Sequence, residues 1–264
     1  MSELKLAAQL YTLRDQMKTP EEIRAGLERV RKIGYTSVQV SGIGKVKPIK
    51  PEELHKICES LGITICATHS PFDEILNNTE KVAEDHRIIG CPLVGIGSGG
   101  PLVFTDHPKL DNYKKLARQL NEAGEKLHRY GLRFAYHNHN AEFVKLEDGS
   151  IGFETLIRET DPSLVGFILD TYWVQAGGAN PIDYIRLLKG RIEVIHLKDM
   201  ALDSKRNPVF SEIGGGNINW KPVLDACSET GVRTAAIEQD VCPRDPFDCL
   251  RASYDYLHGK FGLN

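Results

Sequence analysis

The 264-residue sequence lacks several features that mark specialised classes of protein. Its six cysteines include no CxxC pair and are too sparse for a disulfide-stapled secreted domain. No run of about eighteen apolar residues occurs, and residues 1–13 lack the basic start and long apolar stretch of a secretory signal. We therefore expect reduced thiols, a cytoplasmic location and no membrane partner.

Clustered positive charge is also missing. The 33 Lys and Arg are outnumbered by 36 Asp and Glu, and no basic run stands out. Because nucleic-acid binding depends on clustered Lys and Arg, we expect no nucleic-acid partner. The glycine-rich residues 97–100 and 214–216 lack the GxGxxG spacing and the Walker lysine, so we interpret them as loops.

What the sequence does contain is a recurring unit of amphipathic helix, glycine and short apolar strand. The predicted helices of these units end at Gly34, Gly62, Gly90, Gly131, Gly190 and Gly231. With apolar runs near residues 6–11 and 165–169 it gives about eight strands alternating with about eight helices. Strands that are mostly continuous apolar runs favour a buried parallel sheet. The sequence therefore predicts an α/β fold, a single (β/α)8 TIM barrel domain over residues 1–264.

Chemistry in such barrels sits at the carboxyl ends of the strands, so the residues that end the apolar runs are the candidates. Buried carboxylates there are costly unless they share a cation. Asp, Glu and His without a thiolate suit Mn²⁺, Mg²⁺, Co²⁺ or Zn²⁺. The predicted strands end in Thr68-His69, in His137-Asn138-His139 followed by Glu142, in Asp170, in His196-Leu197-Lys198-Asp199, and in Glu238-Gln239-Asp240.

Each candidate ligand has a structural alternative. Asp170 could simply cap the next helical turn, and His196 alone in a strand could be a core histidine. Glu238, which closes an apolar strand, has little structural use. Lys198 could do no more than pair with Asp199. Taken together, the strand ends favour a metal site.

The fourth ligand is open among three residues of the fifth strand and its end. His137 and His139 alternate by two and therefore share the inward face of the strand. Glu142 lies beyond the strand and has to reach back.

These segments together resemble the xylose isomerase-like TIM barrels, in particular the sugar phosphate isomerase/epimerase group that includes inosose dehydratases and tagatose 3-epimerases. The resemblance covers nearly the whole chain, and its ordered segments are residues 136–143, 169–173, 195–200, 214–220 and 237–240. It implies a metal shell of Glu142, Asp170, His196 and Glu238. His137 departs from the family, because members with a LEP-like strand end have their Glu there. Trp173 replaces a His found in many members, and suggests stacking on a sugar ring.

The resemblance also implies the reaction. Neighbouring oxygens of a sugar or polyol would bind the cation, which stabilises an enediolate. Glu142 and Glu238 would form the acid/base pair of an isomerase or epimerase, with His139 or Lys198 donating to the substrate oxygen. The alternative is a dehydratase acting on an inosose or keto-sugar. The other candidates for substrate binding are His69, His137, Gln9 and Tyr11.

Two other functions are less favoured. An endonuclease IV-like phosphodiesterase would need a trinuclear zinc site with more histidines and a basic face. A non-catalytic sugar-binding barrel would not need to retain the ligand set Asp170, His196 and Glu238. The sugar, its phosphorylation, the metal and any homo-oligomer remain open, although residues 214–216 could offer amides to a phosphate.

Overall fold

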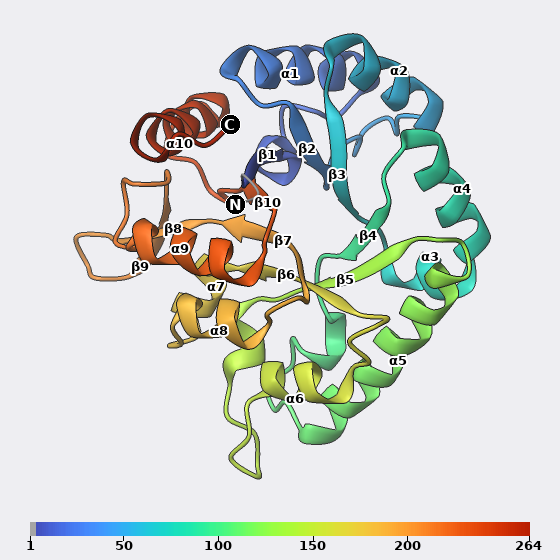
Figure 1. Cartoon of the computed structure of the whole chain (residues 1–264), viewed down its shortest axis with the longest axis vertical. Coiled ribbons are helices and arrows are strands. Elements are labelled where there is room, and N and C mark those ends of the chain that lie inside the picture. Colours follow the sequence, from blue (N-terminus) through green and yellow to red (C-terminus); the bar gives the residue numbers. More distant parts are fainter. Residues whose placement is uncertain (1–3) are drawn as a thin grey trace.

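Eight short apolar runs form the strands of a closed parallel barrel in the computed structural model, which describes residues 4–264 (Figure 1). Each strand pairs with its neighbours in parallel register, and β1 closes the ring against β10. The predicted (β/α)8 TIM barrel is confirmed. The barrel strands are β1 (Lys5–Gln9), β2 (Ser37–Val40), β3 (Thr64–His69), β4 (Leu93–Ile96), β5 (Arg133–His137), β6 (Gly166–Asp170), β7 (Ile192–Leu197) and β10 (Thr234–Ile237).

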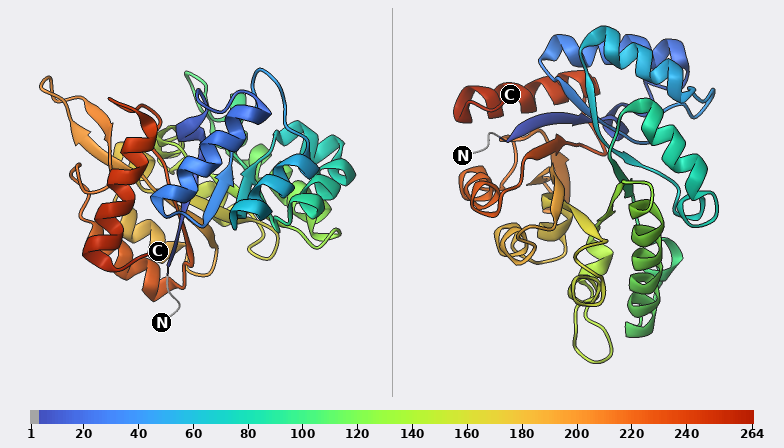
Figure 2. Two further views of the ribbon diagram at one scale, coloured as in Figure 1. Left: turned by 90° about the horizontal axis from the view of Figure 1, so that it is seen from above. Right: turned by 45° about the vertical axis from the view of Figure 1, so that its right-hand side comes forward.

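Helices surround the barrel, as the two further views in Figure 2 show. Local sequence explains their ends: Thr19 and Glu22 form a capping box at the first helix, and Gly62 ends the second with a φ of 62°. The α-helices are α1 (Pro20–Ile33), α2 (Pro51–Leu61), α3 (Phe72–Asn77), α4 (Thr79–Ile89), α5 (Leu110–His128), α6 (Gly152–Glu159), α7 (Thr171–Ala176), α8 (Pro181–Leu187), α9 (Trp220–Thr230) and α10 (Pro246–Phe261). Three 3-10 turns are η1 (Leu10–Leu13), η2 (Gly100–Leu102) and η3 (Asn140–Phe143).

The inside of the barrel is layered. Small apolar side chains fill one layer, formed by Ala7, Ala67, Leu93, Ala135, Ile168, Val194 and Ala236. Residues two positions further along a strand point to the same face. Polar residues therefore form the next layer toward the carboxyl ends: Gln9, His69, His137, Asp170, His196 and Glu238. The apolar layer thus packs against the polar layer on the side of the amino ends of the strands.

The long segment after β7 contains an antiparallel hairpin, β8 (Asp199–Leu202) and β9 (Pro208–Ser211). The hairpin projects from the barrel in the left view of Figure 2. Its Phe210 stacks on Tyr172 with ring centroids 4.3 Å apart and contacts Trp173 at 5.7 Å. The hairpin is therefore anchored next to the carboxyl ends of β6 and β7.

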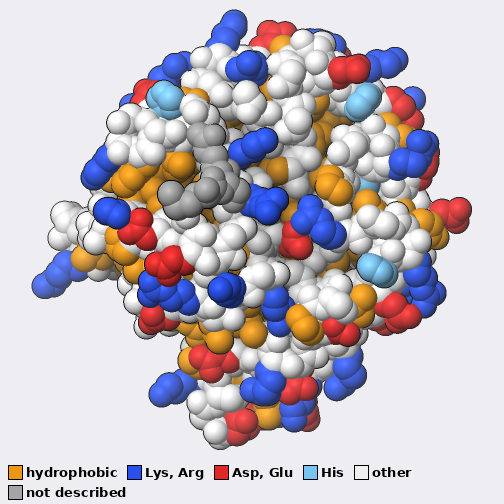
Figure 3. All heavy atoms as spheres, in the orientation of Figure 1, with side chains coloured by type: hydrophobic (Ala, Val, Ile, Leu, Met, Phe, Trp, Pro, Cys, Tyr) orange, Lys and Arg blue, Asp and Glu red, His pale blue; other side chains and the backbone are white. Residues whose placement is uncertain are grey.

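On the face drawn in Figure 3, positive and negative side chains are interspersed. All six cysteines are unpaired, in agreement with the prediction of reduced thiols. Within residues 4–264, no helix has both the length and the apolar character needed to cross a bilayer.

Candidate metal centre and active site

Four side chains from separate strand ends converge inside the barrel. His137, Asp170, His196 and Glu238 each offer a ligand atom, and these atoms lie within 4.8 Å of one another. All four residues are buried. The structure thus brings together Asp170, His196 and Glu238, as predicted, and adds His137, one of the three residues considered for the fourth position. We call these four residues the ligand cluster.

Glu142 does not join the ligand cluster. It lies in η3, where the Tyr136 hydroxyl donates to its Oε1 (2.6 Å) and the His139 backbone N–H donates to its Oε2 (3.0 Å). Burial raises the pKa of this carboxyl to about 7. The prediction of Glu142 as a ligand and as an acid/base partner of Glu238 therefore does not match its position, because both of its oxygens are used by the turn after β5.

The two imidazoles of the ligand cluster are oriented as metal ligands usually are. His196 Nε2 lies 2.7 Å from Gln39 Oε1, and His137 Nδ1 lies 3.3 Å from the Ile168 carbonyl oxygen. His196 Nδ1 in turn lies 3.0 Å from Glu238 Oε2, so carboxylate and amide oxygens face both nitrogens of this ring. With the proton on the nitrogen that faces Gln39 or the Ile168 carbonyl, the other nitrogen of each ring would keep its lone pair for a cation.

Asp170 has two roles, one for each oxygen. Its Oδ1 accepts the Trp173 backbone N–H (3.0 Å) and caps α7, so the capping alternative is also correct. Its Oδ2 is buried and accepts no hydrogen bond of good geometry, but the Lys198 ammonium lies 3.1 Å away and His196 Nδ1 3.7 Å away. This oxygen is therefore held by charge alone, and a cation could bind it as well.

A buried lysine lies against the carboxylates. Lys198 Nζ is 3.1 Å from Asp170 Oδ2, 2.8 Å from Glu238 Oε2 and 3.0 Å from Asp240 Oδ1. Burial would lower the pKa of Lys198, but the three carboxylates raise it above its usual value. Burial would raise the pKa of Glu238, but Lys198 and His196 hold it well below its usual value. All these groups except Asp240 are at most 5 % exposed.

The charges of this region do not balance. With neutral imidazoles, three carboxylates and one ammonium leave an excess of two negative charges. The pKa of His196 shows the same imbalance: burial would lower it, yet Glu238 and Asp170 raise it above its usual value. A divalent cation would neutralise the excess, so the residues present fit such a metal.

Lys198 does not pair with Asp199, which was the alternative. Asp199 is fully buried and turns to the other side, toward the segment between β9 and α9. Its carboxylate accepts five N–H groups, those of Met200, Gly214, Gly216, Ile218 and the Trp220 indole, at 2.8 to 3.2 Å. We call this arrangement the loop clamp.

A pocket of about 430 Å³ adjoins the ligand cluster and shares His137 and Glu238 with it. Its size suits a small molecule. It includes most of the predicted substrate-binding residues. The lining consists of Tyr11, Arg14, Ser41, His69, Gly97, Ser98, Phe104, His137, His139, Lys198, Glu238, Asp240 and Val241.

Two predicted substrate-binding residues do not line this pocket. Gln9 is buried, and its Oε1 accepts the Tyr11 backbone N–H at 2.8 Å. Trp173 packs beside His139, with ring centroids 5.2 Å apart, and against Phe210. The expected stacking of Trp173 on a sugar ring does not match its position, because His139 stands on the pocket side of the contact.

Two more imidazoles face the pocket with a nitrogen that has no partner. His69 Nε2 and His139 Nδ1 are buried and make no hydrogen bond. Burial lowers the pKa of His69 to about 3 and that of His139 to about 4, so both rings are neutral near pH 7. Their ring centroids lie 5.3 and 4.9 Å from that of His137. The pocket therefore has two neutral bases next to a candidate metal ligand.

Sequence reasoning assigned no role to three polar residues of this region. Gln39 bonds His196, Asn138 Oδ1 accepts the Asp170 backbone N–H (3.0 Å), and Asp240 contacts Lys198. Burial and the neighbouring Glu238 raise the pKa of Asp240 to about 6. The available signal was a polar residue in or directly after an apolar strand, which Gln39 shows clearly in Ser37–Val40.

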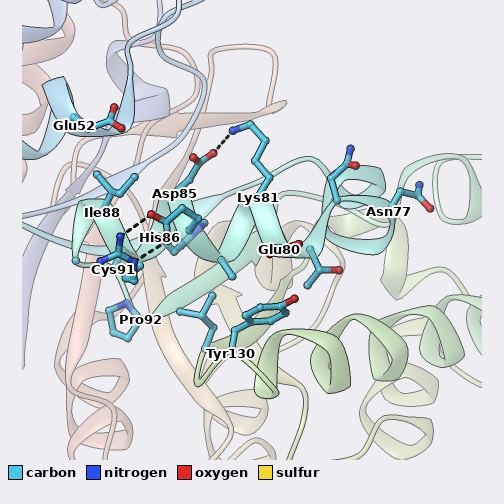
Figure 4. Close-up of a pocket in the computed structure, with 17 residues that line it drawn as sticks. Glu52, Asn77, Glu80, Lys81, Asp85, His86, Ile88, Cys91, Pro92 and Tyr130 are labelled. Atoms are coloured by element: carbon cyan, nitrogen blue, oxygen red, sulfur yellow. Dashed lines mark hydrogen bonds and ion pairs between the residues drawn. The ribbon is translucent and has the colours of Figure 1, made fainter.

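A larger hollow, of about 1320 Å³, lies along the outer face of α4 (Figure 4). Figure 4 shows the Lys81–Asp85 ion pair on its rim, and Tyr130 on another side. His86 is buried there, with its two ring nitrogens 2.8 Å from Thr68 Oγ1 and 2.7 Å from the Val82 carbonyl oxygen. It contains no convergent ligand set of the kind found in the barrel, so we place the chemistry in the smaller pocket.

Comparison with known proteins agrees with this geometry. The family model described as xylose isomerase-like TIM barrel matches residues 27–245. An inosose dehydratase from Lacticaseibacillus casei is 24% identical, covering 99% of this chain and 98% of that protein. A sugar phosphate isomerase/epimerase from Parabacteroides distasonis ATCC 8503 has a similar structure, with a TM-score of 0.83, 22% identity, and coverage of 100% and 96%. The IolI protein with a bound zinc atom has a TM-score of 0.73, 18% identity, and 97% coverage of both chains.

Proposed function

The chain belongs to the xylose isomerase-like TIM barrel family, and on that basis we propose that it is a divalent-metal-dependent isomerase or epimerase of a sugar or polyol. The observation that carries the proposal is the pocket's combination of groups. A four-residue ligand cluster lies beside two neutral imidazoles with unpartnered nitrogens. In metal-assisted removal of a proton next to a carbonyl, a cation binds the substrate oxygens and a base takes the proton. The ligand cluster and the imidazoles would supply these two groups.

His137, Asp170, His196 and Glu238 are the residues that would hold the metal. When bound, it would supply a Lewis acid for the substrate's carbonyl and neighbouring hydroxyl oxygens. The zinc in the IolI protein supports this assignment, since that protein has the same fold. Lys198 would keep the neighbouring carboxylates ionised and in place.

The two imidazoles of the pocket replace the predicted pair of Glu142 and Glu238. One of them, His69 or His139, accepts the proton from the carbon next to the carbonyl. Return of this proton to the adjacent carbon, with passage of the hydroxyl proton to the former carbonyl oxygen, completes an isomerisation. In an epimerisation the first imidazole releases its proton to water, and the second imidazole, protonated by water, delivers a proton to the opposite side of the same carbon. Both rings are neutral at pH 7, so the unpartnered nitrogen of each has a lone pair, although the burial that lowers their pKa also makes them weaker bases than an exposed imidazole.

A dehydratase is the second candidate, because the inosose dehydratase relative matches over 98% of its length. The first step is the same. The imidazole that has taken the proton then gives it to a hydroxyl on the next carbon, which leaves as water.

The test uses purified protein loaded in turn with Mn²⁺, Co²⁺ or Zn²⁺ and incubated in deuterated water with D-fructose, L-ribulose and scyllo-inosose. NMR should show deuterium next to the carbonyl in an isomeric product. Loss of water from the substrate would favour the dehydratase. Absence of both exchange and dehydration for every compound, with metal bound, would contradict the proposal.

Variants separate the roles of the imidazoles and the ligand cluster. His69→Gln and His139→Gln should each lower kcat by about 10²-fold, the usual contribution of a general base. His139→Gln should bind metal as the unchanged protein does, whereas His69→Gln should bind it somewhat more weakly, because His69, His137 and His196 form a second possible ligand set. His55→Gln in α2, outside the pocket, is the matched control and should retain kcat. Full activity of both pocket variants would remove the imidazoles from the mechanism.

A further inference from the structure

The two cationic side chains that line the pocket already contact other groups of the protein. Of the described residues that line it, Arg14 and Lys198 are the cations. The Arg14 guanidinium donates to the backbone carbonyls of Tyr11 and Asp240, each at 2.8 Å, and lies 4.3 Å from the centroid of the Tyr11 ring. Lys198 is surrounded by three carboxylates. Lys45 lies 5.9 Å from the Tyr11 ring but is exposed and does not line the pocket.

The amides that the sequence suggested for a phosphate are used by the protein itself. The N–H groups of Gly214 and Gly216 donate to Asp199 in the loop clamp. The other glycine-rich segment contributes Gly97 and Ser98 to the lining. Glu238 and Asp240 line the same pocket and would repel an anion.

The mouth of the pocket, by contrast, is apolar. Phe104 and Val241 line it and are 51% and 63% exposed. Phe104 also lines an adjoining hollow of about 340 Å³, together with the apolar Val103, Pro108, Ala141 and Val144 and the polar Thr105 and Asp106. Large apolar side chains that remain exposed beside a binding pocket are typical of contacts made by a ligand. We call this hollow the apolar annex.

We propose that the site takes an uncharged sugar or polyol bearing an apolar substituent, and that this substituent binds in the apolar annex. The inference rests on the proposed function and narrows its substrate class. It disfavours a sugar phosphate, because Glu238 and Asp240 line the pocket and Lys198 is already paired with them. The Parabacteroides distasonis protein is named for sugar phosphates, but at 22% identity it shows the fold alone.

The test is calorimetric titration of the metal-loaded protein with matched methyl and phenyl glycosides that carry a ring ketone, because the proposed function requires a carbonyl next to a hydroxyl. A phenyl ring in the apolar annex should strengthen binding by about tenfold over the methyl glycoside. Glucose 6-phosphate should bind more weakly than glucose, and inorganic phosphate should not compete. Equal binding of methyl and phenyl glycosides, or no binding of either, would overturn the inference. Tighter binding of glucose 6-phosphate than of glucose would do the same.

A variant of an exposed residue locates the substituent. Val144→Ser should remove most of the preference for the phenyl glycoside and leave binding of the methyl glycoside unchanged, because Val144 lines the apolar annex and not the main pocket. Leu187→Ala, which shortens another exposed apolar side chain on α8, is the matched control. An unchanged preference in Val144→Ser would refute this location.

This binding measurement is independent of turnover. Deuterium exchange without a phenyl preference would leave the proposed reaction standing and reject the substrate class. A phenyl preference without exchange or dehydration would do the opposite. The two proposals can therefore fail separately.

Discussion

Two adjacent residues at the end of β7 serve two regions of opposite character. Lys198 turns to the ligand cluster, where carboxylates and imidazoles crowd together with an excess of negative charge. Asp199 turns to the loop clamp, where one carboxylate accepts five N–H groups. Both charges are buried, but three carboxylates share the single charge of Lys198, whereas the Asp199 carboxylate is fully supplied with donors.

The difference shows how to distinguish a structural charge from a functional one. The hydrogen bonds of the loop clamp satisfy Asp199 with neutral donors and leave nothing for a ligand. In the ligand cluster, Asp170, Glu238 and the neighbouring Asp240 share one ammonium, that of Lys198, and the carboxylates raise the pKa of His196 against burial. Burial of a charged group alone therefore does not identify the functional site. A group of buried charges that their neighbours do not neutralise does identify it.

The largest effect should come from breaking the loop clamp. Asp199→Ala leaves five buried or part-buried donors without their acceptor, and we expect a loss of about 4 kcal/mol in the free energy of unfolding. Chemical denaturation of metal-free protein measures it. Asp225→Ala, which breaks the exposed Lys221–Asp225 pair, is the control and should change stability by less than about 0.5 kcal/mol. A small loss for Asp199→Ala would contradict the structural role.

The next effect concerns Glu142, a buried carboxyl that belongs to neither region. Its pKa is about 7 in the folded protein against 4.5 when exposed, so the folded state holds the proton more tightly. Its contribution to stability is therefore fully present below about pH 4.5 and is lost as the pH rises through 7. Glu142→Gln stays neutral, so unfolding should show it more stable than the unchanged protein by up to about 3 kcal/mol at pH 8.5, and similar at pH 4.5. A constant difference between these pH values would refute the raised pKa.

Removing one carboxylate from the ligand cluster tests its function directly. Asp170→Asn should weaken Mn²⁺ binding by at least about 100-fold, since changes to residues that only support ligands already cost up to this much. Without metal its thermal stability should be unchanged or higher, because one uncompensated negative charge is gone. Glu142→Gln should bind Mn²⁺ normally. Weak binding by Glu142→Gln would restore Glu142 to the ligand shell.

The smallest effect should come from a residue that acts through an imidazole. Gln39→Leu removes the acceptor that fixes the protonated nitrogen of His196, and we expect about tenfold weaker Mn²⁺ binding. Ser37→Ala, two residues earlier on β2, is the matched control and should bind Mn²⁺ normally. Equal Mn²⁺ affinity in both variants would show that Gln39 does not orient the ring.

The fold was predictable because its signals are local. Glycines at helix ends, proline and threonine at helix starts, and apolar runs of strand length all lie within one unit of the repeat. The same periodicity placed Asp170, His196 and Glu238 at strand ends, and in a closed barrel strand ends necessarily meet.

The contacts that cross the barrel were not predictable in this way. The choice of His137 over Glu142 depends on the Tyr136 hydroxyl and the turn at η3, which capture the carboxylate. The partners of Lys198 depend on which of two adjacent side chains points inward. Trp173 packs against His139 on the side away from the pocket, because α7 begins directly after Asp170. None of these follows from the spacing of residues along the chain.

The loop clamp also bears on how molecules reach and leave the pocket. Its amides at Gly214, Gly216 and Ile218 are tied to a carboxylate beneath them, so they should exchange with solvent as slowly as those of the barrel strands. A segment held this firmly is unsuited to be a gate. Substrate and product would then enter and leave past Phe104 and Val241 at the mouth of the pocket. Turnover would be limited by chemistry or by product release past these residues instead of by loop opening.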